Sequence, residues 1–193
     1  MVRLSKAVLK RDSIMTYYSM EYNSLVGKIT LVCDDANLVG LWLEGHKYSD
    51  DTLCKLIESP SHDILIMGKD WLDDYFAGKK PEISDLPLAP IGSKFRQEVW
   101  KTLMEIPYGE VITYGRIAKE LIERTGVKNM SSQAVGGAVG HNPISIIIPC
   151  HRVVGSNGSL TGYSGGLEKK IKLLQHEGID TSKFSIPKTG TAL

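Results

Sequence analysis

The chain has 193 residues, of which 42% are hydrophobic and 23% are charged, with a formal net charge of +1. No apolar stretch approaches the ~18 residues of a membrane-spanning helix, and residues 1–13 lack the apolar core and cleavage site of a signal peptide, so no membrane partner is expected. Three cysteines at wide spacing argue against a disulfide framework and predict a reducing compartment, the cytoplasm.

The charge is unevenly distributed along the chain. Residues 1–91 hold 10 Lys and Arg against 14 Asp and Glu, whereas residues 92–193 hold 13 against 8. A basic half is typical of a protein with a polyanionic partner. An uneven scatter of solvated charges explains the same count equally well, so the charge alone does not decide between the two.

Three strands and a helix are predicted in the first half. The strand segments are short and rich in β-branched and aromatic residues, and the polar turn at residues 34–37 between the last two predicts a hairpin. Apolar residues then recur at steps of three and four over residues 61–78, which predicts a helix. The strands are expected at residues 14–20, 28–33 and 38–43, and the inner helix face at Ile64, Met67, Trp71 and Tyr75.

A proline-rich, aperiodic segment at residues 79–92 is predicted to be a linker. We therefore place a domain boundary near Gly92, with an N-terminal domain over residues 1–91 and a second domain over residues 92–180. The last residues, 181–193, are expected to form a flexible tail.

The second half is predicted to be mainly helical. After a first helix, Thr113 can cap a second helix, and Ser131 or Ser132 can cap a short third one. Helix, turn and short helix is the outline of the helix-turn-helix motif of DNA-binding domains, although many helical proteins share it. The inner faces are expected to be Phe95, Val99, Leu103 and Ile106 in the first helix, and Tyr114, Ile117, Ala118 and Leu121 in the second.

The third helix is almost bare of side chains. Each of its glycines costs ~1 kcal/mol of helix propensity. Tight packing against a neighbouring helix is one explanation, and close approach of the backbone to a narrow surface such as a DNA minor groove is the other. The segment alone supports both equally. Its small residues are Ala134, Gly136, Gly137, Ala138 and Gly140.

A last helix is predicted from residue 167 onward, closed by Gly178. Its apolar residues are expected to face inward and its lysines outward. The inward set is Leu167, Ile171 and Leu174, and the outward set is Lys169, Lys170 and Lys172.

Cys150 and His151 stand side by side after an apolar run that ends at Pro149. A thiol needs a base to become a nucleophilic thiolate at neutral pH, and a carboxylate can hold that base in place. Glu177, on the last helix, could reach back to complete a Cys-His-Glu relay. A buried cysteine beside a surface histidine is the alternative, because successive side chains on an extended chain point in opposite directions.

Metal binding is the other use of these residue types. Cys150 and His151 lack a companion at metal-ligand spacing. Four residues of the first half could in principle gather around zinc, but their spacing matches no compact site, so no metal and no cofactor are expected. These four residues are Cys33, His46, Cys54 and His62.

Three segments of the second half closely resemble the O6-alkylguanine–DNA alkyltransferases, also called methylated-DNA–protein-cysteine methyltransferases. The segments are "IPYGEVITYGRIAKEL", "AVGGAVGHNP" and "NPISIIIPCHRVVGSNGSLTGYSGGLEKKIKLLQHEG", and the resemblance covers nearly all of Phe95 to Gly178. The Pro-Cys-His-Arg-Val core, with Asn-Pro upstream and Tyr-Ser-Gly-Gly downstream, is highly specific. The resemblance implies an α/β protein, with an N-terminal ribonuclease H-like α/β domain and a C-terminal helical domain of the helix-turn-helix (winged-helix-like) type.

The resemblance also implies roles for the site residues. In this family the cysteine at the position of Cys150 takes the alkyl group from O6 of a guanine flipped out of the duplex, which otherwise buries the line of attack. His151 acts as the base through a bound water, and Glu177 orients that histidine. Asn142 braces the turn near the active site. Tyr114 donates to N3 of the flipped base and supplies a proton as guanine leaves.

The partner implied by the resemblance is double-stranded DNA, with the third helix in the minor groove. Family members often carry an arginine finger just before Ala-Val-Gly-Gly, where this chain has Gln133, which brings no charge and a poorer stacking plane. The pocket residues would be Val153, Tyr163, Ser164 and Gly165, and the DNA-binding residues Tyr114, Arg116, Ser132, Gln133, Ala134, Gly136, Gly137 and Gly140.

We expect a monomer that transfers one methyl or alkyl group irreversibly, from O6-alkylguanine and as a further candidate from O4-alkylthymine. No second thiol, reductant site or cofactor motif exists to remove the group from the cysteine. Three other functions fit the sequence less well. A lesion-recognition protein of the alkyltransferase-like class lacks the acceptor cysteine, a methylation-switched transcription activator needs an additional N-terminal module, and a cysteine hydrolase would leave the helix-turn-helix outline unexplained.

Overall fold

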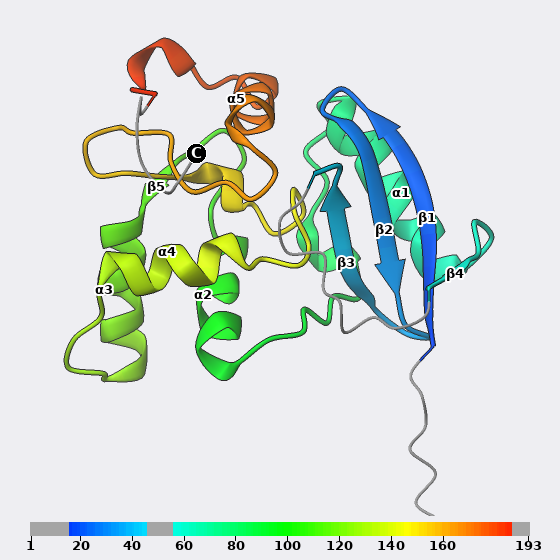
Figure 1. The fold of residues 1–193 in the computed structure, drawn as a ribbon, viewed down its shortest axis with the longest axis horizontal. Coiled ribbons are helices and arrows are strands. Elements are labelled where there is room, and N and C mark those ends of the chain that lie inside the picture. Colours follow the sequence, from blue (N-terminus) through cyan, green and yellow to red (C-terminus); the bar gives the residue numbers. More distant parts are fainter. Residues whose placement is uncertain (1–15, 46–55, 187–193) are drawn as a thin grey trace, which may run out of the picture.

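The structure is a computed structural model that describes residues 16–45 and 56–186 (Figure 1). A four-stranded sheet with one covering helix forms the N-terminal half, and helices around a two-stranded sheet form the C-terminal half. Within these described ranges no helix is long and apolar enough to cross a membrane. The predicted α/β class is confirmed.

The N-terminal sheet has the strand order β3-β2-β1-β4, in which β2 is antiparallel to both of its neighbours and β4 is parallel to β1. The predicted hairpin is confirmed, because Asp34 Oδ1 accepts hydrogen bonds from the amides of Ala36 and Asn37 at 2.8 and 2.7 Å and so closes the turn. The strand β4 was not predicted, since three residues are too few to show an alternating pattern. The bounds are β1 (Tyr17–Ser24), β2 (Gly27–Cys33), β3 (Leu38–Leu43) and β4 (Leu56–Glu58).

The helix α1 (Asp63–Phe76) packs against one face of this sheet (Figure 1). A Cβ atom at Gly68 would lie 2.7 Å from Leu31 Cδ2, so glycine allows the helix to approach β2 closely. This contact turns the buried face of the helix by about one residue from the predicted one, and the prediction was wrong at Met67, which is 40% exposed. The buried residues are Leu65, Gly68, Trp71, Leu72 and Tyr75.

The outer edge of β3 is paired along most of its length by later parts of the chain. The predicted linker supplies the first pairing, in which Leu38 N–H donates to Pro87 O at 2.8 Å and Ala89 N–H donates to Leu38 O at 3.0 Å. Residues 143–145 of the C-terminal half supply the second, through Leu41 N–H to Pro143 O at 2.8 Å and Ser145 N–H to Leu41 O at 3.0 Å. Backbone hydrogen bonds therefore join the two halves.

The C-terminal half contains the predicted helices, and the predicted caps of the second and third are confirmed. Ser93, Thr113 and Ser131 accept a hydrogen bond from an amide of the first turn, which identifies Ser131 rather than Ser132 as the cap of α4. Phe95 is 37% exposed, so the inner face of α2 begins at Val99 rather than at Phe95 as predicted. The bounds are α2 (Lys94–Met104), α3 (Tyr114–Thr125), α4 (Ser132–Gly140) and α5 (Leu167–His176), with β5 (Ile112–Thr113) parallel to β6 (Val153–Val154).

The three helices α2, α3 and α4 pack against one another, as the helix-turn-helix outline requires. Trp100, fully buried, donates its indole N–H to Ala138 O at 2.9 Å and so ties α2 to α4. Gly137 and Gly140 do not serve this packing, because Cβ atoms at these two positions would meet nothing within 4 Å. The packing explanation of the bare helix is therefore wrong for these two glycines.

Two further expectations differ from the structure. Lys170 points inward and is 0% exposed, because its aliphatic stem lies on the buried face of α5 and its ammonium group finds backbone acceptors. The described part of the expected flexible tail, residues 181–186, is held to the protein, because Ser185 pairs with Gly158 and Leu160 through backbone hydrogen bonds of 2.9 Å. Residues 187–193 lie outside the described ranges.

Candidate active site

Cys150 lies in a single 3-10 turn, η2 (Cys150–Arg152), between Pro149 and β6. In this tight turn the side chains of consecutive residues need not point in opposite directions, as they would on an extended strand. Cys150 is 2% exposed and His151 is 0% exposed, so the alternative of a surface histidine is wrong. The turn gathers a thiol, an imidazole and a guanidinium within the protein.

Asn142 holds the thiol and the loop before it. Its Nδ2 group donates to Cys150 Sγ at 3.1 Å and to Ile148 O at 2.7 Å, and its Oδ1 accepts from Ile144 N–H at 3.0 Å. The loop it spans contains Ile146 at φ 70°, a left-handed backbone that β-branched residues rarely adopt. The buried amide of Asn142 therefore braces a strained loop that ends at the cysteine.

Burial raises the pKa of the Cys150 thiol. The hydrogen bond from Asn142, the positive charge of Lys170 and nearby backbone amides act in the opposite direction, but burial outweighs them. The resting thiol is therefore protonated at neutral pH, and it needs a base to react as a nucleophile.

Glu177, which directly follows α5, is the acceptor around which the buried polar groups gather. His151 Nε2 lies 2.6 Å from its Oε1, and Arg152 donates to both carboxylate oxygens at 2.8 and 3.0 Å. Tyr75 and the amide of Gly109 add hydrogen bonds at 2.8 and 3.2 Å. Burial acts to raise the pKa of Glu177, but the hydrogen bonds from His151 and Arg152 and the guanidinium charge outweigh it and hold that pKa well below its usual range.

The ionised carboxylate determines the tautomer of His151. Burial lowers the pKa of His151 more than the carboxylate of Glu177 raises it, with Arg152 and Lys170 adding to the lowering, so the imidazole is neutral at pH 7. Glu177 can only accept, and Nε2 must therefore carry the hydrogen, which leaves the lone pair on Nδ1. Within the described ranges Nδ1 has no hydrogen-bond partner. A neutral imidazole with a free lone pair is a general base.

Lys170 is a buried cation that the sequence analysis placed on the wrong side of its helix. Its Nζ donates to Val153 O at 2.6 Å and to Thr161 O at 2.8 Å. Burial lowers its pKa to about 8, against the opposing effect of a Cys150 thiolate. The spacing could have revealed it, since Lys170, Leu173, Leu174 and Glu177, all buried, follow the helical repeat.

Arg152 and Tyr75 were also missed. Arg152 is part of the recognised Pro-Cys-His-Arg core, so its proximity to Glu177 could have been suspected, and it also donates to Ile106 O at 2.7 Å. Tyr75 is 102 residues away from Glu177 in the sequence, and no local pattern signals that contact. Both side chains line a cleft of about 730 Å³ between α1, the linker and the end of α2, which neither Cys150 nor Tyr114 lines.

Most of the expected pocket residues belong to the segment that follows the Cys150 turn. Tyr114 donates its hydroxyl to Thr161 O at 2.9 Å, and burial together with the charge of a Cys150 thiolate raises its pKa to about 12. Gly162, at φ 72°, permits this contact, because a Cβ there would lie 2.6 Å from the Tyr114 hydroxyl. Gly165 allows the same loop to approach β3, because a Cβ there would lie 2.6 Å from Leu43 Cδ1. Val153, Tyr163 and Ser164 are buried.

The expected DNA-binding residues lie on α3 and on α4, which are adjacent in Figure 1. Arg116 is exposed but forms an ion pair with Glu120 at 2.6 Å. On α4 the residues Ser132, Gln133, Ala134 and Gly137 are exposed, and Gly136 and Gly140 are half-buried. The exposed face of α4 thus carries Gln133 as its one long side chain among the described residues.

Metal ligands do not gather in the described ranges, where no group of three His, Cys, Asp or Glu residues could hold an ion. Cys33 and His62 do meet, with Sγ 3.5 Å from Nδ1, although their spacing did not predict it. His46 and Cys54 lie outside the described residues. Two ligands are too few for a structural zinc site.

Comparison with known proteins places the chain in a family. Residues 16–90 match the model of the 6-O-methylguanine DNA methyltransferase ribonuclease-like domain, and residues 94–179 match that of its DNA binding domain. Together with the fold and the buried cysteine site, these matches define a DNA-repair methyltransferase. The chain belongs to the methylated-DNA–protein-cysteine methyltransferases, whose known reaction is direct transfer of a methyl group from DNA to a cysteine of the protein.

Three relatives illustrate the similarity. The chain is 52% identical to the methylated-DNA–protein-cysteine methyltransferase of Shigella flexneri over 109 residues, which are 56% of this chain and 61%, less than two thirds, of that protein. It is 40% identical to that of Haemophilus influenzae over 164 residues, which are 84% and 87% of the two chains. A crystal structure of Mycobacterium tuberculosis OGT in complex with DNA is 38% identical, with a TM-score of 0.69 over 88% of this chain and 94% of that one.

Proposed function

We propose that Cys150 is the acceptor of the alkyl group and that His151 and Glu177 form the base relay that activates it. The observation that carries this proposal is the buried pair of His151 and Glu177 at 2.6 Å next to the thiol that Asn142 holds. The carboxylate keeps the proton on Nε2, so Nδ1 can take the thiol proton through a bridging water. The resulting imidazolium is paired with Glu177.

The transfer step then follows from this arrangement. The thiolate sulfur attacks the alkyl carbon, a C–S bond forms, and the bond from that carbon to O6 of guanine breaks with its electrons going to the base. Tyr114, whose pKa of about 12 keeps its hydroxyl protonated, donates to N3 of the leaving guanine. The product is a thioether, and no group of the described site can remove it, so each molecule acts once. O4-alkylthymine is a further candidate substrate for the same step.

DNA would bind through the minor groove, with α4 against the groove floor and the damaged base flipped into the pocket of Val153, Tyr163, Ser164 and Gly165. The open positions Gly137 and Gly140 support this, because they let backbone approach a narrow groove. Gln133 is the residue that occupies the gap left by the flipped base. Arg116 would release Glu120 to contact a phosphate.

The remaining expectations complete the proposal. Residues 1–91 and 92–180 form separate domains, which the two family models over residues 16–90 and 94–179 support. The protein is a cytoplasmic monomer, a location that the free cysteines Cys33 and Cys150 of the described ranges support.

Mass spectrometry after mixing with duplex DNA that contains O6-methylguanine tests the acceptor. We expect one added methyl group, carried by the peptide that contains Cys150. Cys150→Ser should abolish transfer and retain DNA binding, whereas Cys33→Ser, which changes another buried free cysteine, should leave transfer intact. Transfer by the Cys150→Ser protein at a comparable rate would show that another residue accepts the group.

A further inference from the structure

Tyr75 brings a hydroxyl group from the N-terminal half to the centre of the active-site network. Its Oη donates to Glu177 Oε1 at 2.8 Å, across 102 residues of sequence. The residue is 1% exposed, and burial together with the charge of Glu177 raises the pKa of Tyr75 far above its usual value. The hydroxyl is therefore a permanent donor to the carboxylate.

The hydrogen bond ends on the same oxygen atom that holds the imidazole. Glu177 Oε1 accepts from His151 Nε2 at 2.6 Å and from Arg152 Nη2 at 3.0 Å, in addition to Tyr75. Donors that share one acceptor divide its charge among them, so each additional donor weakens the hold on the others. The hydroxyl of Tyr75 thus acts on how strongly Glu177 binds the proton of His151.

The packing of the Tyr75 ring does not require its hydroxyl group. Its ring stacks on Trp71 with centroids 5.5 Å apart and meets Tyr108 edge-on at 5.9 Å, contacts that a phenylalanine ring would keep. Burying a hydroxyl costs free energy unless it is hydrogen-bonded. Its one hydrogen bond among the described residues is the one to Glu177.

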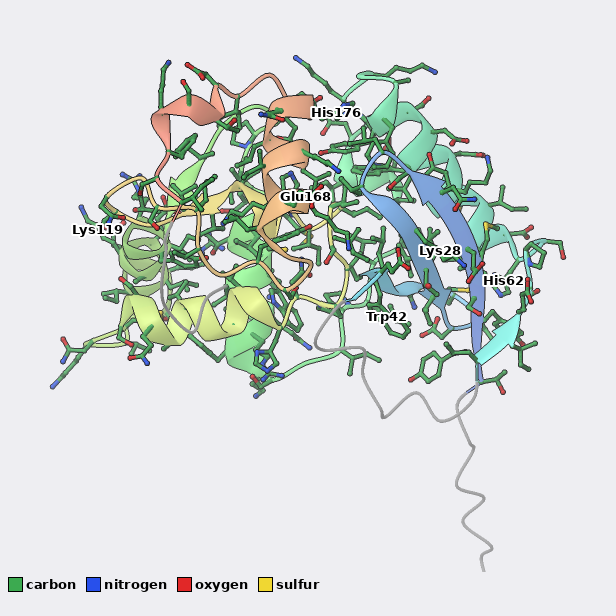
Figure 2. All side chains as sticks on the ribbon, turned by 45° about the horizontal axis from the view of Figure 1, so that its top comes forward. Lys28, Trp42, His62, Lys119, Glu168 and His176 are labelled. Atoms are coloured by element: carbon green, nitrogen blue, oxygen red, sulfur yellow. The ribbon has the colours of Figure 1, made fainter. Side chains whose placement is uncertain are left out.

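The end of α5 is held in place by other bonds. His176, labelled in Figure 2 where α5 meets the N-terminal half, has its Nε2 2.8 Å from the backbone oxygen of Tyr75. Tyr108 donates its hydroxyl to the backbone oxygen of His176 at 3.2 Å. The first contact uses the His176 side chain and the second its backbone oxygen, and both leave the carboxylate of Glu177 untouched.

We propose that Tyr75 is a positioning residue of the transfer reaction, through which the N-terminal domain completes the donor set of Glu177 and tunes the base His151. This inference rests on the proposed relay. It makes the relay an assembly of both halves, since the acceptor, the base and the carboxylate come from one half and this donor from the other.

The direction of the effect follows from the groups around the pair. Glu177 is faced by His151, Arg152, Tyr108, Tyr163 and Tyr75, and His151 is faced by Glu177, Arg152 and Lys170. Removing the Tyr75 hydroxyl leaves more charge on Oε1, which favours the imidazolium and raises the pKa of His151. Because His151 must be neutral to take the thiol proton, the rise of the rate with pH should move to higher pH.

The test is the single-turnover rate of transfer from free O6-benzylguanine by full-length Tyr75→Phe, measured from about pH 5 to about pH 9. We expect the acid limb to move up by roughly half a pH unit, so that the rate at a fixed pH on that limb falls about threefold. Tyr108→Phe is the matched control. This change removes a hydroxyl that holds the end of α5 through the backbone oxygen of His176. We expect its pH profile to match that of the unmodified protein.

Glu177→Gln, measured in parallel, separates this inference from the relay itself. A slow Glu177→Gln protein with an unchanged Tyr75→Phe profile would overturn the role of Tyr75 and leave the relay standing. Equal shifts in Tyr75→Phe and Tyr108→Phe would also overturn it, because the hydroxyl would then act only by holding α5. A Glu177→Gln protein that keeps its fold and its rate would instead refute the relay.

Discussion

Lys170 Nζ and Tyr114 Oη donate hydrogen bonds to the same carbonyl oxygen, that of Thr161, at 2.8 and 2.9 Å. A carbonyl oxygen has two lone pairs, and both are used here. Lys170 also donates to Val153 O at 2.6 Å, so one buried cation ties the segment after the Cys150 turn to the loop that meets Tyr114. The charge near the thiol and the position of the tyrosine thus depend on a single side chain.

Lys170→Met should make the thiol of Cys150 a weaker acid, because the positive charge of Lys170 lowers the thiol pKa and methionine keeps only the stem. We expect that pKa to rise, and transfer at pH 7 to slow by about tenfold for each unit of the rise. The pH dependence of Cys150 labelling by iodoacetamide, followed by mass spectrometry, measures the change. Lys172→Met is the control, since Lys172 is exposed and pairs with Glu168. An unchanged labelling profile in Lys170→Met would contradict the electrostatic role.

Glu177 should make the fold sensitive to acid. Its pKa is depressed in the folded state, so its contribution to stability is present above the unfolded value of about 4.3 and is lost as pH falls through the folded value. The free energy of unfolding, measured with urea, should therefore fall below about pH 4.

Glu177→Gln should be less stable at pH 7 by roughly 3–5 kcal/mol, because the buried guanidinium of Arg152 loses its counter-charge. The same variant should lose this part of the acid sensitivity. Glu168→Gln, on the exposed side of α5, should change neither, and a stable Glu177→Gln protein would show that water reaches Arg152 freely.

Gly137→Ala should separate folding from DNA binding. A Cβ at this position meets nothing within 4 Å, and alanine is the better helix former, so the free energy of unfolding should rise by about 1 kcal/mol. If α4 lies in the minor groove, affinity for duplex DNA should fall while the reaction with free O6-benzylguanine stays unchanged. Gly68→Ala is the contrasting change, since it clashes with Leu31 and should destabilise the protein. Unaltered duplex affinity in Gly137→Ala would remove α4 from the interface.

Gln133→Arg should speed repair of duplex DNA and leave the reaction with the free base nearly unchanged. Extrusion of a base costs a few kcal/mol unless something fills the gap, and arginine offers a planar cation that stacks and hydrogen-bonds. Gln133 is exposed at the start of α4, so the change should not disturb the fold. Gln133→Gly should slow the duplex reaction alone. Parallel changes on both substrates would mean that Gln133 acts on the pocket.

The sequence predicted features that depend on local patterns, and it missed those that depend on contacts between distant segments of the chain. The helix caps Thr113 and Ser131 act within one turn, so position along the chain suffices to find a cap. Assigning the lysines of the last helix to its exposed face by their charge failed at Lys170, because the carbonyl oxygens of Val153 and Thr161 accept hydrogen bonds from its ammonium group. The contact between Tyr75 and Glu177 requires that the two halves be placed against each other, which no periodicity encodes.

The glycines of α4 are a second case in which the spatial surroundings decide. Sequence alone could not choose between packing and a ligand surface for Gly137, because both favour a missing side chain. The choice depends on which atoms surround the position in space, and none lies within 4 Å of its Cβ site.

The shared edge of β3 has a consequence for how the molecule unfolds. Residues 87–89 and 143–145 pair with consecutive parts of that strand, so swinging the halves apart would break backbone hydrogen bonds and expose a sheet edge that favours aggregation. Interdomain hinges are common where few contacts cross between domains, and this strand removes that freedom. We therefore expect one cooperative melting transition for the whole chain. In a complex with DNA, we expect the duplex to change shape while the two halves of the protein keep their arrangement.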